Sequence, residues 1–180
     1  MSDGTELAGK HAFITGGGHG IGGASAVGLA ANGAILTLTG RNMEKLEKMA
    51  AALPGAEVRG LDVTDEDAVK RVFAEATASL GPVDILINNS GIADTAPFLR
   101  TSSDMMRRIM EVNLIGTHTC TQQVLQGMID AGWGRVVNIA SLAGLSGQPY
   151  IAAYCASKHA VIGLTRTLAL EVVKKGITVN

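Results

Sequence analysis

Short apolar runs alternate along the whole chain with longer stretches in which apolar and polar residues recur at helical spacing. The apolar runs predict strands at His11–Thr15, Ala34–Thr39, Glu57–Leu61, Val83–Asn88, Arg135–Ala140 and Ile177–Asn180. The stretches between them predict helices at Gly20–Ala31, Glu44–Leu53, Asp65–Leu80, Ser103–Ala131 and Tyr154–Lys175. Apolar strands that alternate with amphipathic helices pair in parallel through right-handed crossovers. The pattern therefore predicts a doubly wound parallel sheet in three α/β/α layers.

Two predicted helices begin at residues with the spacing of a capping box. Thr64 stands three residues before Asp67, and Thr101 stands three residues before Asp104. A hydroxyl at the first position of such a pair accepts a bond from an unpaired backbone N–H of the first turn. We expect both threonines to cap their helices.

Length and charge favour one domain, residues 1–180, in the cytoplasm. The 180 residues carry 15 basic and 16 acidic side chains, a balance that gives no electrostatic case for binding nucleic acid or an anionic membrane. The segment Met1–Lys10 is polar, and no apolar run reaches membrane-spanning length. Cys120 and Cys155 are too few for a disulfide framework. The four histidines are scattered, so no metal site is expected.

A glycine-rich loop follows the first predicted strand and precedes the first predicted helix. Strand, glycine loop and helix are the context of a dinucleotide-binding turn in a Rossmann fold, because glycines let the backbone approach a pyrophosphate. The helix N-terminus then offers unpaired N–H groups to the phosphates. An ordinary turn between strand and helix is the alternative. The cofactor residues predicted here are Gly16, Gly18, His19, Gly20, Ile21 and Gly22.

Tyr154, Lys158 and Ser141 form the candidate catalytic set. Tyr154 and Lys158 are four residues apart, on one face of a predicted helix, and Ser141 ends an apolar run thirteen residues before Tyr154. A phenol can pass a proton to or from an oxygen, a nearby ammonium favours the phenolate, and a hydroxyl can bind the reacting oxygen. A Tyr-x-x-x-Lys pair alone is often an accident of composition, so the catalytic interpretation depends on the other motifs of the chain.

The joint pattern resembles the short-chain dehydrogenase/reductase family from about Lys10 to the last residue. Its motifs occur in the order of that family: Thr15-Gly-x-x-x-Gly-Ile-Gly22, Asn88-Asn-Ser-Gly91, Asn113, Ser141 and Tyr154-x-x-x-Lys158. The resemblance implies an oxidoreductase that transfers a hydride between a nicotinamide cofactor and a ketone or secondary alcohol.

The resemblance also implies roles for residues outside the candidate catalytic set. Asn113 would anchor a water that links Lys158 to solvent, and Lys158 would also hold the nicotinamide ribose together with Tyr154. Asp62 and Val63 would contact the adenine ring, although Asp62 could instead be an acid that starts the next helix. The strand end beside the ribose would be formed by Asn89, Ser90 and Gly91, with Ser90 in place of the commoner alanine.

Arg41 favours NADP(H) over NAD(H). An NAD site places an acid near the end of the second strand, to accept from the ribose 2′-hydroxyl. Here the segment Leu36–Asn42 has no acid and offers the guanidinium of Arg41, which suits a 2′-phosphate. In the resembling family, His19 also occupies a place where some NADP-using relatives carry a base. NAD(H) stays possible, since Arg41 could be a solvated turn charge.

The loop Leu142–Ile151 is expected to line the substrate pocket. It is mostly apolar or small and contributes Gln148 and Tyr150 as polar contacts, beside Ser141 and Tyr154. Tyr150 has no cation one turn away, so it is assigned to the pocket wall and not to proton transfer. The loop holds no Arg, Lys or His that could bind a small carboxylate. We expect a neutral ketone or alcohol, or a 3-oxoacyl thioester whose charges lie far from the carbonyl.

Two other functions and one departure from the family stay open. A nucleotide-binding regulator or inactive relative would bind cofactor without turnover, and an NAD-dependent sugar-nucleotide epimerase or dehydratase would retain tightly bound NAD. Related chains continue beyond the sixth strand, in which this chain stops, so the sequence is expected to be truncated there. The resemblance further implies a homotetramer or homodimer for the full-length protein.

Overall fold

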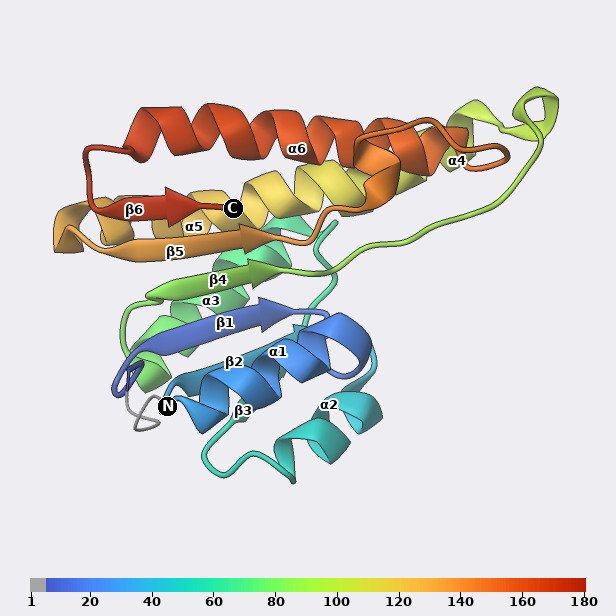
Figure 1. Ribbon diagram of the computed structural model, residues 1–180. Coiled ribbons are helices and arrows are strands. Elements are labelled where there is room, and N and C mark those ends of the chain that lie inside the picture. The colour runs from blue at the N-terminus through green and yellow to red at the C-terminus, as the bar shows by residue number, and fades with distance from the viewer. Residues whose placement is uncertain (1–5) are drawn as a thin grey trace.

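A computed structural model describes residues 6–180, which form a parallel sheet with helices on both faces (Figure 1). The strands lie in the order β3-β2-β1-β4-β5-β6, so the chain builds outward from β1 in one direction and then returns to build outward in the other. Their bounds are β1 His11–Thr15, β2 Ile35–Gly40, β3 Glu57–Gly60, β4 Ile85–Asn88, β5 Gly134–Asn138 and β6 Ile177–Val179. The prediction of a doubly wound parallel sheet is confirmed.

The helices form the two outer layers. They are α1 Gly20–Ala31, α2 Met43–Ala50, α3 Glu66–Leu80, α4 Ser103–Met110, α5 Gly116–Ala131 and α6 Ala152–Val172. Helices α1 and α2 pack on one face of the sheet, and α3, α5 and the end of α6 pack on the other. The buried strand β1 separates the two apolar cores: Phe13 stacks on Phe73 of α3 with ring centroids 3.9 Å apart, whereas Ile14 faces the α1 side.

The predicted helix Ser103–Ala131 is three consecutive segments in the structure. Between α4 and α5 the chain makes a π-helical turn, Glu111–Ile115, which contains the buried Asn113. A wider turn of this kind shifts the helix face by one residue, and such turns occur often at functional sites. The apolar spacing of the sequence does not distinguish this arrangement from a single helix.

The two predicted caps were wrong by one residue. Asp65 caps α3 by accepting from Ala68 N at 2.9 Å, and Ser102 caps α4 by accepting from Met105 N at 3.1 Å. Thr64 instead belongs to the turn before the cap, where its backbone N–H and its hydroxyl both donate to Asp62.

A cluster of charged and aromatic side chains closes the amino ends of the strands. The ring of Trp133 lies against two cations: the Lys10 ammonium is 4.1 Å from its centroid, and the Arg135 guanidinium is 4.4 Å from it. Lys10 Nζ also lies 2.8 Å from Asp84 Oδ1. These contacts hold the residues just before β1, β4 and β5 together.

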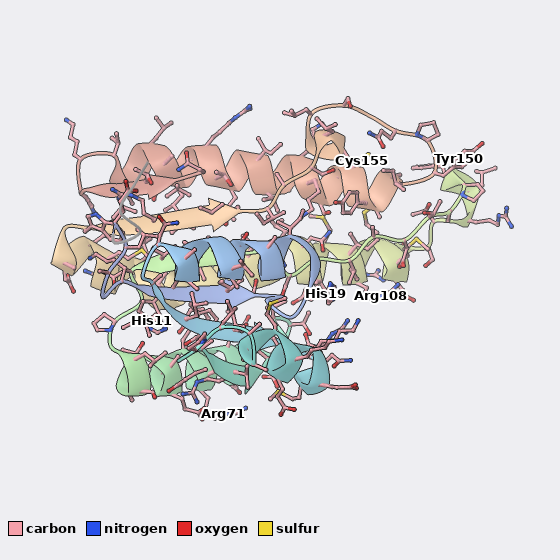
Figure 2. All side chains as sticks on the ribbon, turned by 60° about the horizontal axis from the view of Figure 1, so that its bottom comes forward. His11, His19, Arg71, Arg108, Tyr150 and Cys155 are labelled. Carbon is pink, nitrogen blue, oxygen red and sulfur yellow. The ribbon has the colours of Figure 1, made fainter. Side chains whose placement is uncertain are left out.

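His11 is buried at the same end of the sheet. Its Nδ1 lies 2.8 Å from Gly81 O and its Nε2 lies 2.9 Å from Thr37 Oγ1. Since a carbonyl oxygen only accepts, Nδ1 carries the proton of the neutral ring. Burial lowers the pKa of His11 below its ordinary value. Figure 2 shows His11 toward one side of the molecule and Arg108 and Tyr150 toward the other, with His19 between them.

None of the helices within residues 6–180 is both long enough and apolar enough to cross a bilayer.

Candidate functional site

A cavity of about 500 Å³ opens where β1, β2, β3 and β4 reach their carboxyl ends. Strand β1 lies between β2 and β4, and the chain reverses its direction of winding at this point. In open α/β sheets, ligands bind in the crevice outside such a point. The cavity is lined by Gly16, Gly18, His19, Gly20, Ile21, Gly40, Arg41, Asn42, Lys45, Leu46, Leu61, Asp62, Val63, Asn89, Ser90, Gly91, Ile92 and Val112.

The glycine loop leaves no room for side chains where it meets the end of β4. Gly16 has φ +65°, and a Cβ atom there would lie 2.7 Å from Asn89 Nδ2. A Cβ atom at Gly22 would lie 2.4 Å from Gly16 O. Asn89 Nδ2 donates to Thr15 O and Gly16 O at 3.1 and 3.0 Å, which fastens the loop to β4. The bare backbone at this position is a cradle of the kind that binds a pyrophosphate.

Positive side chains gather on one wall of the cavity. Arg41 and Lys45 are exposed on it, beside His19. Asn42 caps α2 through a 2.9 Å bond from Lys45 N, which fixes the backbone between the two cations. Within residues 6–180 neither Arg41 nor Lys45 forms an ion pair with a carboxylate. These cations could bind an anionic group at this wall.

Asp62 lines the cavity and also closes the turn before α3. Its Oδ1 accepts from Thr64 N at 3.0 Å and from Thr64 Oγ1 at 2.8 Å. These bonds agree with the alternative that Asp62 is a turn acid. Its contact with adenine stays a prediction.

Tyr154 and Lys158 lie one turn apart on α6, next to the cavity. Lys158 Nζ lies 5.8 Å from the centroid of the Tyr154 ring and donates to Ile139 O at 2.6 Å. Lys158 is 5% exposed, and burial lowers its pKa. A Cβ atom at Gly91 would lie 3.7 Å from Nζ, so the ammonium lies close behind the Gly91 wall.

Ser141 caps a short 3₁₀ turn, Leu142–Gly144, that packs on α6. Its Oγ accepts from Ala143 N at 3.2 Å, and this bond leaves the hydroxyl hydrogen available to another acceptor. A Cβ atom at Gly144 would lie 2.8 Å from Lys158 O, so only glycine allows the turn to approach the helix this closely. The contact holds the Ser141 turn against the part of α6 that carries Lys158.

Asn113 is 1% exposed, and its side-chain amide forms hydrogen bonds with two separate segments of the chain. Its Oδ1 accepts from Ile92 N at 2.8 Å, and its Nδ2 donates to Ile92 O and to Ser157 Oγ, both at 3.0 Å. The amide thus joins the wall of the cavity to α6. The relay role of Asn113 stays a prediction, because these bonds are structural links.

Gln148 and Tyr150 lie in the exposed loop between the 3₁₀ turn and α6. Tyr150 has φ +67° and is the only non-glycine residue among positions 6–180 with a positive φ. Its carbonyl accepts from Ala96 N at 2.8 Å, which ties this loop to the segment after β4. Figure 2 shows Tyr150 at the same end of the molecule as Arg108, which forms an ion pair with Asp94.

The cavity contains most, but not all, of the predicted cofactor residues. Gly22, Tyr154 and Lys158 do not line it: Gly22 lies behind the loop, and the other two belong to the adjoining face of α6. Sequence reasoning missed the lining residues Gly40, Asn42, Lys45, Leu46, Leu61, Ile92 and Val112. Several of these adjoin predicted residues at strand ends and could have been found that way. Lys45, Leu46 and Val112 come from helical segments, and only the tertiary fold brings them to the cavity.

Histidine, cysteine and carboxylate side chains are the usual ligands of metal ions in proteins. Among residues 6–180, no three His, Cys, Asp or Glu side chains form a cluster that could hold a metal ion. Burial raises the pKa of the Cys120 thiol to about 12, so it stays protonated at neutral pH.

Comparison with known proteins places the whole described fold among hydroxy-compound dehydrogenases. The sequence profile of a family described as "short chain dehydrogenase" matches residues 10–180. A 2-dehydro-3-deoxy-L-rhamnonate dehydrogenase (NAD(+)) from Sphingomonas sp. (strain SKA58) is 38% identical over 174 residues, which are 96% of this chain and 70% of that protein. An acetoacetyl-CoA reductase from Shinella zoogloeoides is 38% identical over 169 residues, which are 94% of this chain and 70% of that protein.

A solved structure has the same fold. The crystal structure of a candidate short-chain alcohol dehydrogenase from Sinorhizobium meliloti 1021 superposes with a TM-score of 0.92 at 36% identity. The match covers 97% of this chain and 71% of that one.

Proposed function

We propose that this chain, which belongs to the short-chain dehydrogenase family, is an oxidoreductase that transfers a hydride between NADP(H) and a ketone or secondary alcohol. The observation that carries the proposal is the position of Lys158: a buried ammonium 5.8 Å from the centroid of the Tyr154 ring, behind the Gly91 wall of the cavity. Side chains for proton transfer thus adjoin a cavity suited to a dinucleotide.

Three residues, Tyr154, Lys158 and Ser141, would transfer the proton and stabilise the charge on the reacting oxygen. Tyr154 gives its phenolic proton to that oxygen in reduction and takes it back in oxidation. The positive charge of Lys158 stabilises the phenolate that remains, and Ser141 donates a hydrogen bond to the oxygen where negative charge develops. The chemistry of hydride donation and acceptance comes with the bound nicotinamide.

The cavity fits a dinucleotide with an extra phosphate. The Gly16 and Gly22 backbone can approach a pyrophosphate, and Arg41 and Lys45 can bind a 2′-phosphate on the adenosine ribose. The relative named for NAD(+) shows that the family also contains NAD-dependent members. The segment Leu36–Asn42 at the end of β2 carries Arg41 and no acid, which supports NADP(H) for this chain.

Titration of the protein with NADPH and NADH tests the cofactor proposal. We expect NADPH to bind at least tenfold more tightly, and Arg41→Ala to weaken NADPH binding while NADH binding stays within twofold. Equal affinities for the two cofactors in the wild-type protein would contradict the preference. A purified protein that retained bound NAD would favour the epimerase alternative.

The substrate proposal rests on the loop between Ser141 and α6. Its exposed apolar side chains include Leu142 and Leu145, and it offers no cation for a small carboxylate. We therefore infer a neutral ketone or alcohol, or a 3-oxoacyl thioester. Initial rates with NADPH on a panel of neutral ketones, acetoacetyl thioesters and short free keto acids decide this, and a clear preference for the keto acids would exclude our inference.

Substitution of Tyr154 and Tyr150 by phenylalanine tests which of them is the proton donor and which belongs to the pocket wall. Tyr154→Phe should lower kcat by about a thousandfold, within the range of general acid catalysis. Tyr150→Phe should change kcat by less than about threefold, since its hydroxyl takes no part in proton transfer. Cofactor binding without turnover in the wild-type protein would instead support a regulator or an inactive relative.

We further infer that the protein forms a homodimer or homotetramer. Leu170 and Val173 of the α6 segment are 78% and 66% exposed, an apolar surface that a second copy could cover. Light scattering after size exclusion measures the assembly directly, and a monomer at micromolar concentration would contradict the inference.

A further inference from the structure

A series of hydrogen bonds, partly through helix carbonyls, joins α6 to the π-helical turn at Ser157 and to β5 at Thr165. Its members are polar residues in an otherwise apolar interior, and each bond is 2.7–3.0 Å long. In order they are Ser157, Asn113, Thr117, Thr121, Asn88, Asn138 and Thr165, where Thr117 and Thr121 donate to the backbone carbonyls of Asn113 and Thr117. Buried polar groups must find partners, and a satisfied network fixes one arrangement of the elements that it joins.

Ser157 is the end of this series next to the candidate catalytic set. It is 0% exposed and lies between Tyr154 and Lys158 on α6. Its hydroxyl donates to Tyr154 O at 2.8 Å and accepts from Asn113 Nδ2 at 3.0 Å. Ser157 does not line the cavity, so any effect on the reaction must pass through its neighbours.

Asn113 transmits the position of α6 to the wall of the cavity. Each N–H of its amide is used once, toward Ser157 and toward Ile92 O, and its oxygen accepts from Ile92 N. A primary amide has only two N–H donors, so these bonds define the orientation of the side chain. Ile92 lines the cavity directly after Gly91, against which Lys158 lies.

We propose that Ser157 is a positioning residue that sets Tyr154 and Lys158 at a fixed distance from the Gly91–Ile92 wall. The inference rests on the proposed function, because it assigns Ser157 a role in that same reaction. Without the hydroxyl, the π-helical turn and α6 lose the bond between them, and the helix face that carries Tyr154 is free to shift. A displacement of about 1 Å at a reacting group can lower a rate by roughly a hundredfold.

Thr165 provides a matched control on the same helix. Its hydroxyl donates to Val161 O at 2.7 Å and accepts from Asn138 Nδ2 at 2.8 Å, the same pattern of bonds that Ser157 makes. It lies two turns farther along α6, at the other end of the series. Thr165→Val and Ser157→Ala thus each remove one hydroxyl between α6 and an asparagine amide.

The experiment compares kcat, KM for NADPH and the pH profile of kcat in wild type, Ser157→Ala, Ser157→Thr and Thr165→Val. We expect Ser157→Ala to lower kcat roughly 10- to 100-fold, to leave KM for NADPH within twofold, and to move the pH at which kcat is half-maximal. Thr165→Val should lower the melting temperature as much as Ser157→Ala does, without a change in kcat or in the profile. Ser157→Thr, which keeps the hydroxyl, should restore most of kcat.

A loss of stability in Ser157→Ala with wild-type kcat and pH profile would overturn the inference, since it would make Ser157 a packing residue only. Ser157→Cys, with a weaker acceptor of similar size, replaces Ser157→Ala if that variant fails to fold, and the same outcomes apply. Absence of turnover in the wild-type protein would remove the proposed function itself. If the wild-type protein turns over and Ser157→Ala has the same kcat and pH profile, the role inferred for Ser157 is wrong and the proposed function is unaffected.

Discussion

Lys158 carries a charge into a part of the molecule that is closed to water. A buried ammonium lowers the stability of a fold, and an apolar side chain of similar length removes that cost. We expect Lys158→Met to raise the free energy of unfolding by about 1 kcal/mol, because the lost bond to Ile139 O opposes part of the gain. Turnover should fall by at least about a hundredfold.

Urea unfolding and initial rates check the Lys158 prediction. Lys175→Met, at an exposed position after α6, is the control and should change neither quantity. A lower stability of Lys158→Met would show that the bond to Ile139 O outweighs the burial of the charge.

Tyr150 adopts a backbone conformation that favours glycine. A non-glycine residue in the left-handed region is strained by about 1 kcal/mol. The side chain is 62% exposed, so burial offsets little of this strain. We expect Tyr150→Gly to be more stable than Tyr150→Ala by about 1 kcal/mol, since both lose the phenol and only glycine relieves the strain.

Thermal unfolding of the two Tyr150 variants measures this difference. If the phenol forms the wall of the substrate pocket, both variants should also show the same increase in KM for substrate. Equal melting temperatures would mean that the loop relaxes around Tyr150 without cost.

At the scale of single residues, the sequence predicts the spacing and burial of side chains better than it predicts their hydrogen-bond partners. The spacing of Tyr154 and Lys158 on one helix follows from helix geometry. The burial of Asn113 also follows, because its flanking residues are apolar. Its bonds to Ile92 and Ser157 do not follow, since each joins segments that only the tertiary fold brings together.

Among the elements, α2 carries a cation where a helix disfavours one. Lys45 lies in the first turn, near the positive end of the helix dipole, and faces the cavity. We expect Lys45→Gln to weaken NADPH binding about tenfold, which corresponds to about 1.4 kcal/mol, and to leave NADH binding within twofold. The reason is that only NADPH carries the 2′-phosphate.

Fluorescence titration of the nicotinamide measures both affinities. Lys48→Gln is the matched control one turn along α2, outside the cavity, and should affect neither cofactor. A loss of affinity for both cofactors in Lys45→Gln would assign Lys45 to the pyrophosphate or to the fold.

The elements themselves were predicted closely, except at their ends and turns. Apolar strands and amphipathic helices follow from periodicity, and strand β1 and helix α1 begin and end where expected. Caps were misplaced because Thr64 and Asp65 are both good capping residues; in the structure Asp65 caps the helix and Thr64 bonds to Asp62. The π-helical turn around Asn113 has no local signature and depends on packing against α6.

In the whole molecule, the two ends of the sheet differ: one end is open to a cavity and the other is closed by packed side chains. The carboxyl ends of the strands open into the cavity, whereas the amino ends are closed by His11, Trp133 and their partners. This separation follows from winding all the strands in parallel, which was predictable. The full lining of the cavity was not predictable, because it includes side chains from α2 and the π-helical turn.

The buried His11 makes the stability of the molecule depend on pH. Because burial lowers its pKa in the folded protein, the unfolded chain takes up the proton first as the pH falls below about 6.5, the ordinary value. The stabilisation is complete above that value and is lost as the pH falls toward the lower pKa of the folded state, at no more than about 1.4 kcal/mol per pH unit.

Urea unfolding at pH 7.5 and pH 5.5 tests this dependence. We expect the wild-type protein to lose more stability between these values than His11→Gln, whose amide can keep one bond to Gly81 O or Thr37 Oγ1 without titrating. An equal loss in both proteins would assign the pH dependence to other groups.

The single tryptophan makes the closed end of the sheet its own optical reporter. Trp133 lies against Lys10 and Arg135, remote from the carboxyl ends of the strands where the cavity opens. Cations against the indole ring tune its emission, so any loosening of these contacts should shift the intrinsic spectrum. A change in this spectrum during denaturation would therefore signal opening of the amino ends of the strands. The melting of this end of the sheet can then be followed without a label.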